Sequence, residues 1–213
     1  RASIEEETTS SVGGGKNLVV IPEDYRLGGT LLGVAFLLGP VLHLWWPQFF
    51  LHGLLGGFLT FQTTRVRFRF SDDDLDVVFV DDGGDAKAVD TTSSGENMLQ
   101  GGGANKWSFK SVTNWEMWWP GFPVLVFYKE NQTKPGGQPH FFPIIMDGKK
   151  LYEQMLLKMG PSVNAKPPLE DWNLDTALEA TSIGRSIKEQ LDADQLAKLK
   201  EIKDFKDIPK LFG

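Results

Sequence analysis

The chain offers few side chains that could do chemistry, because it has three histidines and no cysteine. Without cysteine, thiolate nucleophiles, disulfides and cysteine-ligated metal sites are excluded. His140 stands on an expected strand and could act as a general base, but no serine lies at a strand–turn–helix elbow to serve as its nucleophile. We therefore interpret His140 as a strand histidine, and we expect no catalytic residues and no enzyme.

The other two histidines, His43 and His52, are candidate axial ligands for a pigment magnesium or a haem iron, since imidazole often takes that position. Their spacing of nine residues is not a recognised paired-ligand spacing. The alternative is that both are ordinary histidines near an aromatic cluster. The sequence therefore requires no cofactor and no metal; contact with chlorophyll, carotenoid or lipid stays open.

Charge is distributed unevenly along the 213 residues. The 28 acidic and 22 basic side chains give a net charge of −6, which argues against a nucleic-acid partner. All of them lie outside residues 27–64, a window without Asp, Glu, Lys or Arg. Broken near Trp45-Trp46-Pro47, that window gives two arms of roughly 27–28 Å each if helical, barely enough to cross a bilayer. We expect a membrane-embedded helical hairpin over 27–64, the alternative being a buried hairpin of a soluble protein.

The flanks and the turn of the window agree with a hairpin. Small-residue pairs, Gly29/Gly33 and Gly53/Gly57, would let the two helices approach closely. Aromatic side chains at the turn fit one membrane interface and arginines after the window fit the opposite one. The contact residues expected here are Trp45, Trp46, Phe49, Phe50, Arg65, Arg67 and Arg69.

The segment 65–160 predicts a small β domain. Residues 63–70 alternate between apolar and arginine side chains, and 75–80 form the returning strand of a hairpin. A low-complexity loop follows at 81–105, then four short aromatic or β-branched runs, then a helix over 147–159 that begins at Asp147. Six strands followed by one helix is typical of a pleckstrin-homology-like β-barrel or sandwich with a C-terminal helix. The fold class is therefore α+β, with the membrane hairpin before this domain.

Two further sets of apolar residues lack an obvious partner in the sequence. Trp118, Trp119 and Phe122 cannot all point inward from a strand, so we expect a membrane-interface or partner contact there. The tail 161–213 contains an amphipathic helix over 192–205, with a capping box from Asp192 to Gln195. Its apolar stripe either folds back on the domain or docks elsewhere, and we favour docking elsewhere; the stripe is Leu196, Leu199, Ile202 and Phe205. Residues 1–26 form an acidic, extended arm.

The runs WSFKSVTNWEMWWPGFPVLVFYKE (107–130) and PHFFPIIMD (139–147), after a hairpin that ends in QTTR (62–65), are distinctive. They resemble an uncharacterised family shared by cyanobacteria and plastid-bearing eukaryotes, in which a short membrane hairpin precedes a small Trp-rich β domain. The resemblance covers residues 27–159. It does not extend to the acidic arm, the 81–105 loop or the tail, and the family supplies no catalytic residues.

The resemblance implies a plastid thylakoid location, with most of the chain on the stromal side. The chain also resembles the accessory, plastid-specific subunits of photosystem I in red-lineage algae. The leading hypothesis is thus a non-catalytic structural subunit that binds photosystem core and stromal subunits and thylakoid lipids. The alternatives are a lipid- or pigment-binding membrane-anchored module or photosystem assembly factor, and an enzyme that would need His140.

Overall fold

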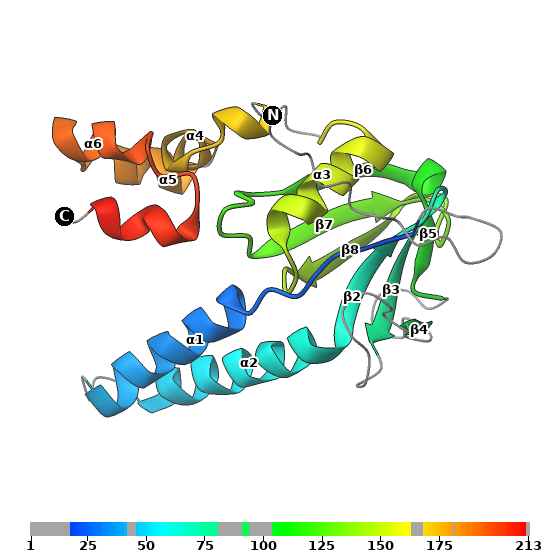
Figure 1. The fold of residues 1–213 in the computed structure, drawn as a ribbon, viewed down its shortest axis with the longest axis horizontal. Helices are drawn as coiled ribbons and strands as arrows, with labels where there is room; N and C mark the ends of the chain where they lie inside the picture. The colour runs from blue at the N-terminus through cyan, green and yellow to red at the C-terminus, as the bar shows by residue number, and fades with distance from the viewer. Residues whose placement is uncertain are drawn as a thin grey trace, which may run out of the picture.

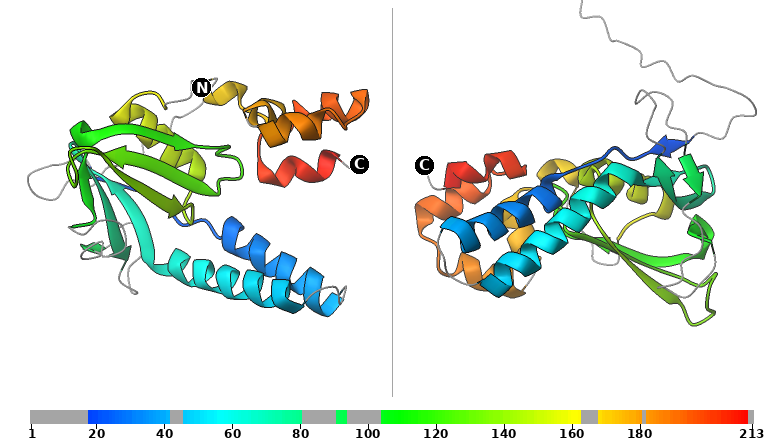
Figure 2. Two further views of the ribbon diagram at one scale, coloured as in Figure 1. Left: turned by 180° about the vertical axis from the view of Figure 1, so that it is seen from behind. Right: turned by 90° about the horizontal axis from the view of Figure 1, so that it is seen from below.

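The computed structural model describes residues 18–41, 46–80, 91–93, 104–162, 168–180 and 182–211. Within them, a helical hairpin and a group of short C-terminal helices extend from the same end of a β domain that contains two antiparallel sheets (Figures 1 and 2). The α+β class is therefore confirmed. His43, Trp45, residues 1–17 and most of the 81–105 loop lie outside the described residues.

The first sheet contains β1 (Val19–Val20), β2 (Val66–Phe70), β3 (Asp74–Val80), β4 (Thr91–Ser93) and β5 (Lys106–Ser108). Its order is β1-β2-β3-β4, and β5 also pairs with β3. The alternation that predicted a strand over 63–70 corresponds to β2, which pairs with β3 as the expected β-hairpin. The end of the N-terminal arm differs from the prediction, because β1 adds an edge strand and Ile21 is fully buried.

The second sheet contains β6 (Val112–Met117), β7 (Leu125–Glu130) and β8 (Gln138–Pro143), in that order. Its strands form a hydrogen-bonded ladder separate from that of the first sheet, so the domain is not one closed barrel. Helix α3 (Gly148–Met159) follows, and the Asp147 carboxylate caps it by accepting from the backbone N–H groups of Lys149 and Lys150, both at 3.0 Å. The ring centroids of Trp115 and Tyr152 lie 5.4 Å apart, which joins the second sheet to α3.

The hairpin consists of α1 (Arg26–Phe36), a π-helical turn η1 (Leu37–Val41) that contains Pro40, and α2 (Trp46–Arg65). None of the helices in the described part of the chain is both long and apolar enough to cross a membrane. The prediction of a transmembrane, membrane-embedded hairpin over 27–64 is therefore wrong. The physical reason is that α1 has only 11 residues, while the 20 residues of α2 include polar side chains at both ends.

The C-terminal group contains the short helices η3 (Leu169–Asp171), α4 (Leu174–Glu179), α5 (Ser182–Lys188), α6 (Ala193–Leu199) and η4 (Phe205–Leu211). The capping box predicted for the tail is present, because the Asp192 carboxylate accepts from the Gln195 N–H and the Gln195 side chain accepts from the Asp192 N–H. The predicted helix over 192–205 is interrupted after Leu199, and a 3₁₀ helix begins at Phe205.

Candidate functional site

The most unusual surface of the protein is the outer side of the hairpin. Eleven large apolar side chains of its described residues are exposed on it, and no charged side chain in residues 27–64 interrupts them. We call this set the apolar hairpin surface: Leu32, Phe36, Leu37, Val41, Trp46, Phe50, Leu51, Leu54, Leu55, Phe58 and Phe61. Such a set is larger than the isolated apolar residues that ordinary surfaces carry, so it marks a site of interaction.

Small residues at the seam between α1 and α2 explain why the large ones point outward. A Cβ atom added to Gly56 would lie 2.9 Å from the backbone nitrogen of Leu32, and one added to Gly28 would lie 2.4 Å from Thr60 Oγ1. These two glycines therefore allow the helices to pack closely. Three of the four glycines expected at the seam, Gly29, Gly33 and Gly57, have no atom within 4 Å of an added Cβ, and Gly53 would meet only the Ala35 Cβ at 3.8 Å.

Aromatic rings cluster at the start of α2, near the turn of the hairpin. The centroids of Trp46 and Phe49 lie 5.4 Å apart, and those of Phe49 and Phe50 lie 5.1 Å apart. Trp46 and Phe50 are exposed, whereas Phe49 is half-buried and faces Gly39. The predicted aromatic cluster at the hairpin turn is therefore present, and its two exposed rings belong to the apolar hairpin surface.

The candidate pigment ligand His52 is half-buried on α2. Its Nδ1 atom lies 2.8 Å from the backbone carbonyl oxygen of Gln48, one turn earlier in the helix. In the described residues no three His, Cys, Asp or Glu side chains gather into a group that could hold a metal ion. This position of His52 fits the ordinary histidine that the sequence left as the alternative.

The three arginines after the window do not form one basic face. The Arg67 guanidinium is buried, donates to the carbonyls of Thr63 and Val66, and forms an ion pair with Glu23 at 3.0 Å. Arg69 pairs with Asp76 at 2.6 Å. Arg65 is the only exposed one of the three, so Arg67 and Arg69 are not available for the predicted contact with an anionic surface, and that contact stays a prediction for Arg65.

The turn over residues 118–122, which we call the tryptophan turn, is covered by the chain's own C-terminal segment. Trp118 Nε1 donates to the Ala177 carbonyl at 3.0 Å, and the Phe122 ring stacks on Phe205 at 4.8 Å. Trp119 is only 2% exposed. The expected membrane or partner contact of Trp118, Trp119 and Phe122 is therefore corrected to an intramolecular contact.

The apolar stripe of the tail is occupied in the same way. Leu199 and Ile202 are fully buried, Leu196 is half-buried, and Phe205 contacts the tryptophan turn through Phe122. The backbone N–H of Leu174 also donates to the Ile202 carbonyl at 2.7 Å. The preference for docking elsewhere is therefore wrong: the stripe is covered by the chain itself, within the C-terminal helices and, at Phe205, against Phe122 of the β domain.

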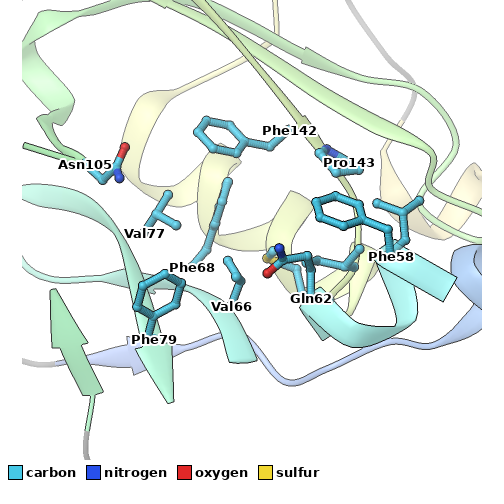
Figure 3. Close-up of a pocket in the computed structure, with 12 residues that line it drawn as sticks. Phe58, Gln62, Val66, Phe68, Val77, Phe79, Asn105, Phe142 and Pro143 are labelled. Atoms are coloured by element: carbon cyan, nitrogen blue, oxygen red, sulfur yellow. The ribbon is translucent and has the colours of Figure 1, made fainter. Parts of the chain in front are cut away.

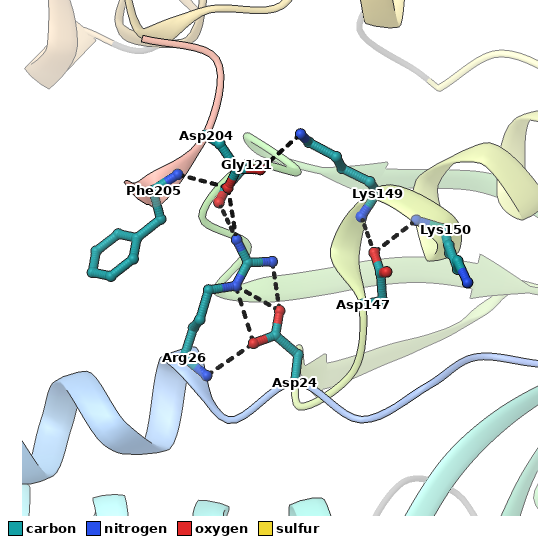
Figure 4. Close-up of polar contacts among 8 residues, drawn as sticks. All are labelled: Asp24, Arg26, Gly121, Asp147, Lys149, Lys150, Asp204 and Phe205. Atoms are coloured by element: carbon teal, nitrogen blue, oxygen red, sulfur yellow. Dashed lines mark hydrogen bonds and ion pairs between the residues drawn. The ribbon is translucent and has the colours of Figure 1, made fainter. Parts of the chain in front are cut away.

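A polar cluster joins the base of the hairpin to the tail and to α3 (Figure 4). The Arg26 guanidinium donates to Asp24, to the Gly121 carbonyl at 2.6 Å and to Asp204 at 3.0 Å. Lys149 Nζ donates to the second carboxylate oxygen of Asp204 at 2.9 Å. Burial opposes ionisation of Asp204, but the hydrogen bonds from Lys149 and the Phe205 N–H and the charges of Lys149 and Arg26 lower its pKa. Apart from the charge of Arg26, no pattern in the sequence predicts this cluster.

An apolar pocket of about 280 Å³ lies at the base of the hairpin, and we call it the basal pocket (Figure 3). The walls of the pocket come from helix α2, from strands β2 and β3, and from the end of β8 and the segment that follows β8. Asn105 completes the lining. Its lining is Phe58, Leu59, Gln62, Val66, Phe68, Val77, Phe79, Asn105, Phe142, Pro143, Ile145 and Met146. Sequence reasoning missed this pocket, because its walls are distant in the chain and share no motif.

His140 lies in the core, only 1% exposed, and its Nε2 is 2.9 Å from Glu130 Oε1. Trp107 and Tyr128 pack against its ring at centroid distances of 4.6 and 5.1 Å. Burial raises the Tyr128 pKa well above its ordinary value, and the Glu130 charge adds to the shift. A substrate would have to enter the core to reach His140, so this placement fits a structural strand histidine.

Residues 19–160, about two thirds of the chain, match the sequence model of a family described as Protein of unknown function (DUF3119). The match includes the whole segment, 27–159, on which the resemblance to an uncharacterised family rests. It carries no information about photosystem I, thylakoids or a red-lineage alga. Searches of curated proteins and of solved structures found no match to the chain.

Proposed function

The chain belongs to the DUF3119 family, and we propose that it is a non-catalytic docking protein whose hairpin binds the apolar surface of another protein. One observation carries this proposal, the exposed apolar side chains of the apolar hairpin surface. Soluble monomers rarely expose a contiguous apolar patch of more than a few hundred Å² unless it binds something. Covering this one with a partner would remove it from water.

The rest of the architecture supports a docking role. The two other apolar sets predicted to dock elsewhere, the tryptophan turn and the tail stripe, are covered mainly within the chain itself, and Phe122 stacks on Phe205 where they meet. The ion pairs of Arg26 with Asp24 and Asp204 fix the base of the hairpin to the remainder of the protein. A partner bound to the hairpin would therefore be held at a defined position relative to the β domain.

For the partner we propose a subunit of photosystem I, on the stromal side of the plastid thylakoid. Only the resemblance of the sequence supports this choice. The alternative function, handling of lipid or pigment, has one structural observation in its favour, the basal pocket.

The experiment compares two exposed leucines. Leu54 on the hairpin is 74% exposed and Leu157 on α3 is 73% exposed, so Leu54→Ser and Leu157→Ser remove similar apolar side chains from different surfaces. Tagged full-length variants are incubated with photosystem I solubilised in mild detergent, and the retained fraction is measured. Burying a leucine stabilises a complex by about 1.5–3 kcal/mol, so Leu54→Ser should weaken retention roughly tenfold or more.

The control Leu157→Ser should be retained like the unaltered protein. Equal retention of both variants would contradict docking through the hairpin. Failure of the unaltered protein to be retained would contradict photosystem I as the partner, and self-association that Leu54→Ser abolishes would replace it with a second copy of the chain.

A further inference from the structure

The lining of the basal pocket defines what it can hold. None of its lining side chains is charged, and the amides of Gln62 and Asn105 are its polar groups. Figure 3 shows Phe58 and Gln62 reaching in from α2, with Phe68, Val77 and Phe79 on the adjacent strands and Phe142 opposite. A charged group placed among them would lose its hydration without compensation. The part of a ligand inside the pocket must therefore be uncharged and apolar.

The size of the pocket further limits which ligands it can hold. Its volume of about 280 Å³ is just below the range of ~300–1,000 Å³ typical of pockets for drug-sized ligands. It can take one narrow chain or the end of one. Phe58 both lines the pocket and is 56% exposed on the apolar hairpin surface, so the pocket continues into a surface along which a longer chain could lie.

A cation stacks on one of the rings that line this pocket. The Arg65 guanidinium carbon is 5.1 Å from the ring centroid of Phe79, which lines the pocket, and 5.4 Å from that of Phe61. Stacking on two rings holds the guanidinium in place while leaving its N–H groups free to donate. Arg65 is exposed and has no ion pair with any residue that the structure describes, unlike Arg67 and Arg69.

We propose that the basal pocket binds the hydrocarbon chain of a single-chain amphiphile, whose anionic head pairs with Arg65. The hydrocarbon chain supplies the apolar surface that the pocket requires, and the head supplies an anion for the Arg65 guanidinium, which has no ion pair among the described residues. A carboxylate from a free fatty acid and a phosphate from an anionic lipid share this chemistry. The site goes beyond the docking function and does not require the hairpin to be covered by a protein.

The test is calorimetric titration of the full chain with decanoate, decyl phosphate and decanol, each below the concentration at which it aggregates. The two anions should bind more tightly than decanol, and whichever anion binds more tightly identifies the source of the head group. Lengthening the carboxylate from octanoate to decanoate should increase affinity about fourfold for each added methylene that is buried. No binding of any of the three probes would overturn the proposal.

Variants distinguish binding of the hydrocarbon chain in the basal pocket from binding of the anionic head by Arg65. Val77→Phe fills the pocket and should abolish binding of all three probes. Arg65→Gln should reduce the affinity for the two anions to that for decanol, while the affinity for decanol stays the same. Lys134→Gln, at an exposed lysine on the β7–β8 turn, should leave the affinities for all three probes unchanged. Loss of anion binding in Lys134→Gln equal to that in Arg65→Gln would overturn the role of Arg65.

Folding of the filled variant is checked by its melting temperature, and Val66→Phe, at a half-buried lining position, is the second filling variant. Unchanged binding in a folded filling variant would overturn the site. If neither filling variant folds, the chain-length series and Arg65→Gln decide the question. Leu54→Ser should leave amphiphile binding intact and Val77→Phe should leave partner retention intact, so failure of this site and failure of the docking function give different results.

Discussion

Arg26 and Asp204 form a 3.0 Å ion pair that joins residues 178 positions apart in the chain. Arg26 is the first residue of α1, and Asp204 precedes the last short helix, η4. Because Lys149 of α3 donates to the same carboxylate, one side chain connects the hairpin, the tail and the β domain (Figure 4). Asp204 therefore lies where the hairpin, the tail and the β domain meet, and it contacts both of the other parts from the tail.

Asp204→Asn should lower the free energy of unfolding at pH 7 by about 1–2 kcal/mol, since it weakens two partly buried charge-assisted hydrogen bonds. The pKa of Asp204 is lowered from its ordinary value of 3.8 despite the opposing effect of burial. The stabilisation is thus fully present above about pH 4 and is lost as pH falls through the folded pKa. Urea unfolding at pH 7 and at pH 3 checks this: the difference between variant and unaltered protein should shrink at pH 3. A difference that grows toward pH 3 would contradict the assignment.

His140→Ala should destabilise the fold by about 1.5–3 kcal/mol, because it removes one hydrogen bond from the buried Glu130 carboxylate, which keeps those from Gln132 and Thr133. Burial opposes ionisation of Glu130, but the hydrogen bond with His140 and those from Thr133 and Gln132 lower its pKa from the ordinary value of 4.5. This contribution is therefore present above about pH 4.5 and is lost as pH falls below it. Denaturant unfolding against pH measures both effects.

The double variant His140→Phe/Glu130→Leu supplies the control, since replacing both partners with apolar residues removes the unpaired charge. It should recover much of the stability lost in His140→Ala. A double variant less stable than His140→Ala would indicate that Glu130 stabilises the fold mainly by accepting from the N–H groups of Gln132 and Thr133, which leucine leaves without this acceptor.

Local patterns in the sequence predicted the elements whose signals are local. Alternation over 63–70 predicted β2, Asp147 marked the start of α3, and Asp192 with Gln195 predicted the cap of α6. Each of these depends on residues within one or two turns or on neighbours along a single strand. The boundaries of β2 and α3 accordingly agree to within a few residues, whereas α6 ends six residues before the predicted end of its helix.

The errors concern contacts between distant parts of the chain. Trp118 meets Ala177, 59 positions later, and no periodicity reveals such a partner. The uncharged window indicated correctly that the hairpin is apolar, but an absence of charge does not distinguish a membrane span from an apolar surface on short helices. The basal pocket likewise depends on how α2 meets two strands and the segment after β8, which only the tertiary structure shows.

The packing of the tail on the domain can be tested with two isoleucines. Ile202 is fully buried and Ile187 is 44% exposed. Ile202→Ala should cost about 2–5 kcal/mol because it leaves a cavity, whereas Ile187→Ala should change stability by no more than about 0.5 kcal/mol. Thermal unfolding of both variants is the measurement. Equal small effects would mean that the tail does not pack on the domain in solution.

The seam of the hairpin can be tested with two neighbouring glycines of α2. At Gly56 a Cβ would lie 2.9 Å from the backbone nitrogen of Leu32, while at Gly57 it would meet nothing within 4 Å. Gly57→Ala should stabilise the protein by up to about 1 kcal/mol, because alanine favours the helix. Gly56→Ala gains the same helical propensity but must push α1 away, so it should be destabilising by about 1–3 kcal/mol. Helical circular dichroism during urea unfolding distinguishes the two, and stabilisation by Gly56→Ala would show that α1 and α2 do not pack through this glycine.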